Sequence, residues 1–153
     1  MAARSRPLRD YAHFWCKEGN PRLYSFPIAD SILALSKVTG DFSTAMDLYP
    51  NLKEIHKARD DHKTACGMYT QLCDRDGMEL SISGDGIRPT LNSYLYADKM
   101  ALSQLADYAG TPASAEAFRR DAEKLRRNIN ERLWNDTIGM FGTISEEGEP
   151  RRR

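Results

Sequence analysis

The 153-residue sequence lacks a long apolar run and lacks an excess of charge of either sign. Because no run of about 18 apolar residues occurs, we expect no segment to span a membrane. The 22 Lys and Arg residues balance the 22 Asp and Glu residues, giving a formal net charge of zero. A chain without net charge has no global field that would draw it to nucleic acid or to anionic lipid. We therefore expect neither a nucleic-acid partner nor a membrane partner.

The beginning of the sequence also lacks the apolar core of a secretory signal peptide, because its first basic residues lead directly into the aromatic stretch at 11–15. Its three cysteines, Cys16, Cys66 and Cys73, are odd in number and irregularly spaced. That pattern argues against a disulfide scaffold and suits a reducing compartment. We expect a cytoplasmic protein, with a periplasmic or secreted one as the alternative if a signal precedes the given sequence.

Several motifs of large enzyme classes are missing as well. The sequence has no GxGxxG, no Walker loop, no HExxH and no GxSxG. The nearest set of nitrogen and sulfur ligands is His62, Cys66 and Cys73, whose spacing differs from that of a zinc ribbon or finger. We therefore expect no metal and no cofactor.

What the sequence does have is the periodicity of amphipathic helices, in a composition ordinary for a globular protein. Apolar stripes at helical spacing recur over residues 25–39, 43–62, 91–110 and 112–133. Gly40 and Gly110 are natural C-terminal ends, while Pro50 predicts either a start or a bend within the second helix. The pattern predicts an all-α fold with two helical hairpins, which is typical of a toroid or solenoid, with a free-standing bundle as the alternative.

Between residues 63 and 90 the helical periodicity stops and glycine becomes frequent. A loop of this length inside a compact domain is uncommon and usually functional. Its central part places Asp74, Asp76 and Glu79 beside Arg75. Carboxylates on a structured loop suit general acid–base catalysis. Solvated loop charges are the alternative, and composition alone favours that alternative because functional carboxylates are a minority.

The stretch that follows the loop carries side chains that suit sugar binding. Arg88 and Asn92 stand near a helix start and can hydrogen-bond hydroxyl groups, and Tyr96 offers an aromatic face. The alternatives are helix capping by Asn92 and packing by the tyrosine, and for the tyrosine packing is the favoured interpretation.

A similar cluster precedes the first apolar stripe. Arg22, Tyr24 and Phe26 lead into a helix that carries Asp30. This arrangement fits a binding rim and fits an ordinary turn between helices equally well.

On these residues the chain resembles the six-hairpin glycoside hydrolases, the (α/α)6-barrel enzymes that include trehalases, family 63 α-glucosidases and the mannosylglycerate-hydrolase-like group. The resemblance extends from about Tyr11 to Phe141. Its most specific part is the segment 76–79, Asp-Gly-Met-Glu, together with the helix start at 88–96. In the family, a Gly–apolar–Asp tripeptide carries the general acid and a similar helix start follows it. The segment 133–141 is similar to the end of a hairpin in these enzymes.

The resemblance implies a partial (α/α)6 toroid and an inverting hydrolysis of an α-glucoside or a related glycoside. It implies that Glu79 is the catalytic acid, with a second carboxylate as the base. Because Glu79 stands where the family has aspartate, Asp76 stays an alternative for that role. Ala29 replaces a tryptophan of the family and removes a stacking surface. The implied substrate-binding residues are Asp76, Arg22, Tyr24, Phe26, Asp30, Arg88, Asn92 and Tyr96.

The sequence is too short for all six hairpins, and the base of the family lies downstream of Phe141. We therefore expect a truncated piece, inactive by itself, that forms one partial barrel domain over 1–153. Within it we expect an active-site loop at 63–90 and a flexible tail at 144–153. The expected partner is a carbohydrate substrate, and the oligomeric state stays open. The alternative function is a non-catalytic helical module that binds a saccharide or a protein, and a plain helical scaffold is a third possibility.

Overall fold

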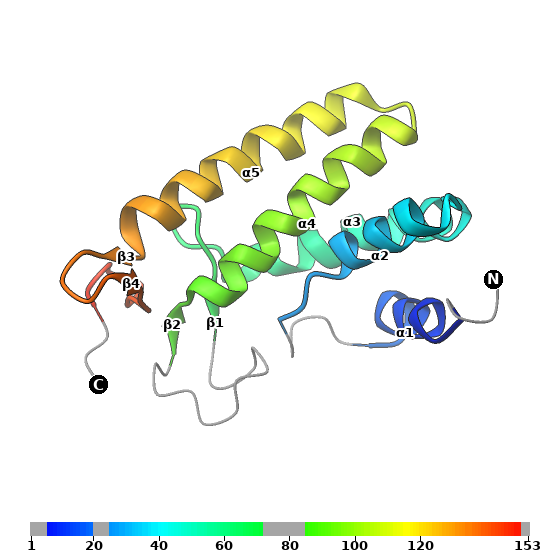
Figure 1. The fold of residues 1–153 in the computed structure, drawn as a ribbon. Coiled ribbons are helices and arrows are strands. Elements are labelled where there is room, and N and C mark those ends of the chain that lie inside the picture. The colour runs from blue at the N-terminus through cyan, green and yellow to red at the C-terminus, as the bar shows by residue number, and fades with distance from the viewer. Residues whose placement is uncertain (1–5, 20–24, 72–84, 151–153) are drawn as a thin grey trace.

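The computed structural model describes residues 6–19, 25–71 and 85–150, and these residues are mostly helical (Figure 1). The predicted all-α fold class is confirmed. The helices are α1 (Arg6–Lys17), α2 (Ile28–Thr39), α3 (Ser43–Ala58), the 3-10 helix η2 (Arg59–His62), α4 (Pro89–Tyr108) and α5 (Pro112–Arg132). Four two-residue strands complete the described elements: β1 (Thr70–Gln71), β2 (Gly86–Ile87), β3 (Trp134–Asn135) and β4 (Met140–Phe141).

The helices form the two predicted hairpins. Figure 1 shows α4 and α5 side by side along their length, with α2 and α3 packed against α4. Gly40 ends α2 in the left-handed conformation, with φ 71°, and Pro112 occupies the first turn of α5, where no backbone N–H is needed. Repeated helical hairpins of this kind make the chain a partial (α/α)6 toroid. None of the helices that the structure describes is long and apolar enough to cross a membrane.

The second predicted helix continues through its proline. Pro50 lies inside α3 and is exposed, so the helix neither starts after it nor ends there. The stretch up to His62 that the periodicity assigns to one helix ends instead in the 3-10 turn η2. Tighter turns of this kind are frequent at the C-terminal ends of α-helices.

Two clusters of buried apolar residues hold the hairpins together. The first joins α1, α2 and α3 to the C-terminal half of α4 and includes Ile32, Leu48 and Leu102. The second joins the N-terminal half of α4 to α5 and includes Leu91 and Leu125. Met68, Tyr69, Ile87 and Ile144 belong to the second cluster, so this part of the core also fixes the non-helical segments on which the candidate site is built.

Candidate functional site

The described ends of the predicted active-site loop form a small antiparallel sheet next to the start of α4. Thr70 pairs with Ile87 and Gln71 pairs with Gly86. Ile87 then exchanges two backbone hydrogen bonds with Ile144, at N···O distances of 2.9 and 3.2 Å. The chain therefore leaves this sheet after β1 and returns to it at β2. Residues 72–84, which include Glu79 and Asp76, lie outside the described residues.

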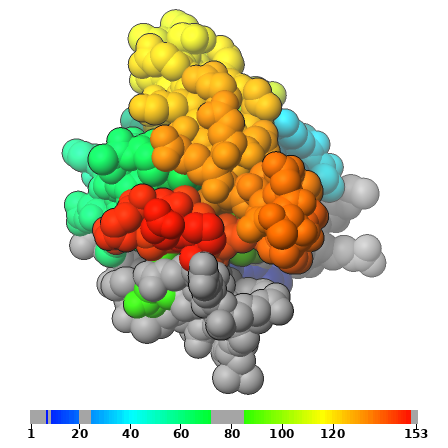
Figure 2. Space-filling model, turned by 90° about the vertical axis from the view of Figure 1, so that its left-hand side faces the viewer, coloured from blue at the N-terminus to red at the C-terminus, as the bar shows by residue number. Residues whose placement is uncertain are grey.

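Ile144 also bears on the predicted tail. This residue is buried, and it bridges to Pro150 as well as to Ile87. Figure 2 shows the C-terminal residues (red) lying beside the segment that contains β3 and β4 (orange). Ile144 and Pro150 thus form isolated bridges beside the two-stranded sheet, while the flexibility predicted for 144–153 stays a prediction.

The backbone at residue 86, in β2, requires a glycine. Its φ of +140° is a conformation that residues with a side chain rarely adopt. A Cβ atom at this position would also overlap the backbone carbonyl oxygen of Ile144. Close approach of the two backbones therefore depends on the missing side chain.

Asn92, in the first turns of α4, holds the sheet to the helix. Its side chain is fully buried, and its Oδ1 accepts a hydrogen bond from the Tyr69 N–H at 2.9 Å. Its Nδ2 donates to the carbonyl oxygens of Tyr69 and Arg88, at 2.9 and 2.8 Å. The amide thus pairs with both backbone groups of Tyr69 as a neighbouring strand would. Because buried backbone groups need partners, this contact fixes where β1 begins.

Arg88 is the residue that precedes α4, and it is only 1% exposed. A guanidinium stays protonated in proteins, so a positive charge is buried at the root of the loop. Buried charges are tolerated only where they are well compensated. Arg88 and Asn92, two of the three sugar-binding candidates of this stretch, are therefore both buried at the point where the loop meets α4.

The second group of candidates lies at the start of α2. The Phe26 ring packs against Trp15, with centroids 4.9 Å apart, and against Tyr11 at 6.4 Å. The side chain of Asp30 is exposed, while its backbone N–H donates to Asp98 at 3.1 Å. The structure thus places Phe26 among the aromatic side chains that join α1 to α2.

Asp98 connects this group to the middle of α4. Its carboxylate is buried and also accepts a hydrogen bond from the Ala29 N–H at 2.9 Å, so it satisfies two of the free N–H groups at the start of α2. Burial raises the pKa of Asp98 to about 7, although the two backbone hydrogen bonds act in the opposite direction. The carboxylate is a capping group supplied by a residue distant in sequence.

The predicted site residues therefore fall at two places along α4. Arg88 and Asn92 lie at its N-terminal turn, and the backbone of Asp30 lies beside Asp98 further along. Tyr96 is half-buried against the second apolar cluster, in agreement with the packing alternative. Arg22, Tyr24, Asp76 and Glu79 lie outside the described residues, so their roles stay predictions.

A buried pair of side-chain nitrogens further along the same helix was not predicted from the sequence. Lys99 and His56 are both buried, and their side-chain nitrogens are 2.8 Å apart. The available signal was the position of Asp98 and Lys99 within an apolar helix, where charged residues are rarely buried without partners. The partner His56 is on another helix, so no spacing rule could have found it. In the ranges 6–19, 25–71 and 85–150, no group of three or more His, Cys, Asp or Glu could hold a metal ion.

Comparison with known proteins gives the class of this fold and site. A solved structure described as a sialidase superposes with a TM-score of 0.83 at 29% sequence identity. The match covers 92% of this chain and 14% of that chain, so this chain spans about one-seventh of the length of that relative. A search of curated proteins gave no match. The class is that of a glycosidase-like helical toroid.

A family model points to one group within this class. Residues 84–152 match the mannosylglycerate hydrolase MGH1-like glycoside hydrolase domain. The matched residues include β2, α4 and α5, and with them Arg88, Asn92 and Tyr96, but they begin after Glu79. The predicted resemblance to six-hairpin glycosidases is confirmed: the chain is similar to part of such an enzyme.

Proposed function

We propose that this chain is the part of an inverting glycoside hydrolase that carries the general acid, and that the enzyme acts on an α-glucoside or a related glycoside. The observation that carries the proposal is that the described residues on either side of the segment 72–84 are held against α4. The β1–β2 sheet, Gly86 and the buried amide of Asn92 hold these flanking residues in place beside α4. Such anchoring favours a segment that positions a reacting group, because catalytic groups need a rigid support.

In the proposed reaction Glu79 donates its proton to the glycosidic oxygen while the bond between that oxygen and the anomeric carbon breaks. A second carboxylate removes a proton from water, and the water oxygen bonds to the anomeric carbon from the opposite face. The second carboxylate comes from a part of the enzyme beyond this sequence. Asp76 is the alternative acid, because it shares the segment and the family places aspartate in this role.

The polypeptide as its source cells make it provides the test. Its intact mass is measured first, and a mass well above 17.4 kDa is expected if the barrel is completed by further hairpins. The purified protein is then assayed on a panel of α-glucosides and related glycosides, with NMR following the anomer released. We expect hydrolysis with inversion. Absence of hydrolysis across the panel by a protein of the longer mass would contradict the proposal.

Replacement of the acid gives the matched test of the residue. We expect Glu79→Gln to lower kcat for a natural glycoside by about 100-fold or more, because general acid catalysis contributes factors of this order. Glu131→Gln, on the exposed surface of α5, is the control and should retain full activity. Asp76→Asn separates the two candidate acids: a loss in this variant with retained activity in Glu79→Gln would assign the role to Asp76.

A non-catalytic saccharide- or protein-binding module is the second candidate. The burial of Arg88 and Asn92 leaves neither side chain on an open sugar subsite, which favours the protein-binding form of this candidate. A native mass of 17.4 kDa, with saccharide binding and no turnover, would support this candidate.

A further inference from the structure

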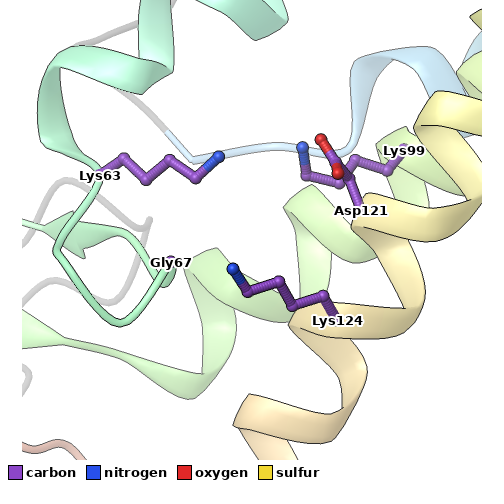
Figure 3. A pocket seen from close by; sticks show the side chains of 5 residues that line it. All are labelled: Lys63, Gly67, Lys99, Asp121 and Lys124. Carbon is purple, nitrogen blue, oxygen red and sulfur yellow. The ribbon is translucent and has the colours of Figure 1, made fainter.

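A pocket lined by lysines lies between the α4–α5 hairpin and the segment that follows η2 (Figure 3). Lys63 and Gly67 come from that segment, Lys99 comes from α4, and Asp121 and Lys124 come from α5. Figure 3 shows the charged side chains reaching from three directions toward one space. None of these residues is among the candidates for sugar binding, so the pocket is an additional feature.

The charged groups around this pocket carry an excess of positive charge. Lys63 forms one long ion pair, with its Nζ 4.0 Å from Asp60. Within the described part of the chain, Lys99, Lys124 and Asp121 make no ion pair. Three ammonium groups line the pocket together with the carboxylate of Asp121, while Asp60 lies beside Lys63. Positive charge stays in excess, and the space between the ammonium groups favours a negatively charged occupant.

Lys99 is the most unusual of these groups, because it is only 4% exposed. Its Nζ is 2.8 Å from Nε2 of His56, and burial lowers the pKa of His56 to about 3. The imidazole is therefore neutral, and its nitrogen accepts a hydrogen bond from the ammonium. Burial also lowers the pKa of Lys99 to about 8, although the carboxylates of Asp121 and Asp60 act in the opposite direction. An isolated buried ammonium is costly, and a bound anion would remove that cost.

The walls of the pocket keep the ammonium groups in place. The Tyr69 ring faces both Lys63 and Lys99, whose Nζ atoms are 5.7 and 5.8 Å from its centroid. Gly67 has a φ of +84°, and a Cβ atom there would lie 3.5 Å from the Lys124 side chain. Asn128 fixes the same turn, because its Nδ2 donates to the carbonyl oxygen of Cys66 at 2.8 Å.

We propose that the pocket binds a phosphate group between the ammonium groups of Lys63, Lys99 and Lys124. Each ammonium offers three hydrogen-bond donors, and charge-assisted hydrogen bonds to phosphate oxygens are short and strong. Asp121 accepts a hydrogen bond from a protonated phosphate oxygen, which sulfate does not have at neutral pH. The site therefore prefers hydrogen phosphate to sulfate. The phosphate comes from free inorganic phosphate or from a small monoester, and this binding is independent of the proposed glycosidase activity.

Titration of the chain with inorganic phosphate at constant ionic strength tests the proposal. Calorimetry gives the Kd, and amide NMR follows Gly67 and Lys99. Saturable binding at these residues, tighter for phosphate than for sulfate, is expected. Methyl phosphate separates the two sources: tighter binding of the ester supports a monoester, and tighter binding of inorganic phosphate supports the free ion. Shifts that do not saturate, or that sodium chloride reproduces, would overturn the site.

Variants give the matched comparison. Lys99→Met and Lys124→Met should each weaken phosphate binding by about tenfold or more, a change of about 1.4 kcal/mol. Asp121→Asn should remove the preference for phosphate over sulfate. Lys17→Met, on the exposed surface of α1, is the control and should leave the Kd unchanged. Lys124 is exposed, so Lys124→Met decides the question even if Lys99→Met does not fold. Equal affinity in Lys124→Met and wild type would contradict the proposal.

Discussion

At the scale of single residues, Asn92 is the strongest link between the helices and the candidate site. Sequence analysis proposed this residue as a sugar ligand or as a helix cap. The structure instead shows its amide pairing with both backbone groups of Tyr69 and with the carbonyl oxygen of Arg88. A single side chain therefore stands in for a strand beside β1. The role of Asn92 in sugar binding stays a prediction. A buried Asn92 side chain would affect sugar binding indirectly, by fixing the position of the loop.

We expect Asn92→Ala to lower the free energy of unfolding by about 2–4 kcal/mol, because the buried N–H and C=O groups of Tyr69 lose their partners. Urea denaturation of the purified chain measures the change. The adjacent exposed residue provides a control, and Ser93→Ala should change stability by less than about 0.5 kcal/mol. Equal stability of the two variants would mean that Asn92 does not anchor the sheet.

Gly86 supports a second prediction at this scale. A methyl group at this residue meets the Ile144 carbonyl and requires an unfavourable φ, so we expect Gly86→Ala to cost about 2 kcal/mol or more. Gly142→Ala is the matched control, because its Cβ would meet nothing within 4 Å. Hydrogen exchange at the Ile87 and Ile144 amides reports the local effect. Unchanged protection in Gly86→Ala would contradict the proposed close approach.

At the scale of elements, Asp98 fastens α2 to α4. Its carboxylate accepts hydrogen bonds from Ala29 and Asp30 at the N-terminal end of α2, where the helix dipole favours negative charge. Burial nevertheless raises its pKa from 3.8 to about 7. A raised pKa means that the folded state prefers the protonated acid. The stabilising contribution is therefore complete below pH 3.8 and is lost as the pH rises through about 7.

This linkage gives a prediction for Asp98→Asn. The variant has no proton to lose, so its free energy of unfolding relative to wild type should rise by about 2 kcal/mol between pH 5 and pH 8. Urea denaturation at the two pH values measures the difference. Asp47→Asn, an exposed carboxylate on α3, should show a difference within about 0.5 kcal/mol. A pH-independent difference for Asp98→Asn would show that the pKa of Asp98 is close to its ordinary value.

The elements themselves differ in how far the sequence could predict them. The four apolar stripes gave the two hairpins, because α2 to α5 each bury one face over three or more turns. The β1–β2 sheet was not predicted, since two-residue strands carry no alternation and their pairing depends on contacts with Asn92 and Ile144. The continuation of α3 through Pro50 was also left open. The proline is tolerated there on the exposed face of the helix.

The candidate site was predicted only in part, for a related reason. Arg88 and Asn92 were identified from their place after a glycine-rich loop, and they do lie at the root of that loop. The buried pair of Lys99 and His56 comes from two helices that the sequence does not place relative to each other. Long-range pairs of this kind depend on the angle between helices, which periodicity does not determine.

At the scale of the whole molecule, the chain matches a small part of a much longer relative. The relative described as a sialidase is matched over 92% of this chain but only 14% of its own length. Several large apolar side chains are exposed here, including Trp134, Ile138, Met140 and Phe141 around the β3–β4 hairpin. Exposed apolar groups that gather in one place often mark an interaction surface.

If Glu79 donates the proton to the leaving oxygen, as proposed, the effect of its replacement depends on whether the leaving group needs that proton. The measurement is kcat/KM of the native-length protein and of Glu79→Gln on an alkyl α-glycoside and on the corresponding glycosyl fluoride, whose leaving group needs no proton. We expect a loss of about 100-fold or more on the alkyl glycoside and a far smaller loss on the fluoride. Equal losses on both substrates, or full activity on the alkyl glycoside, would contradict it.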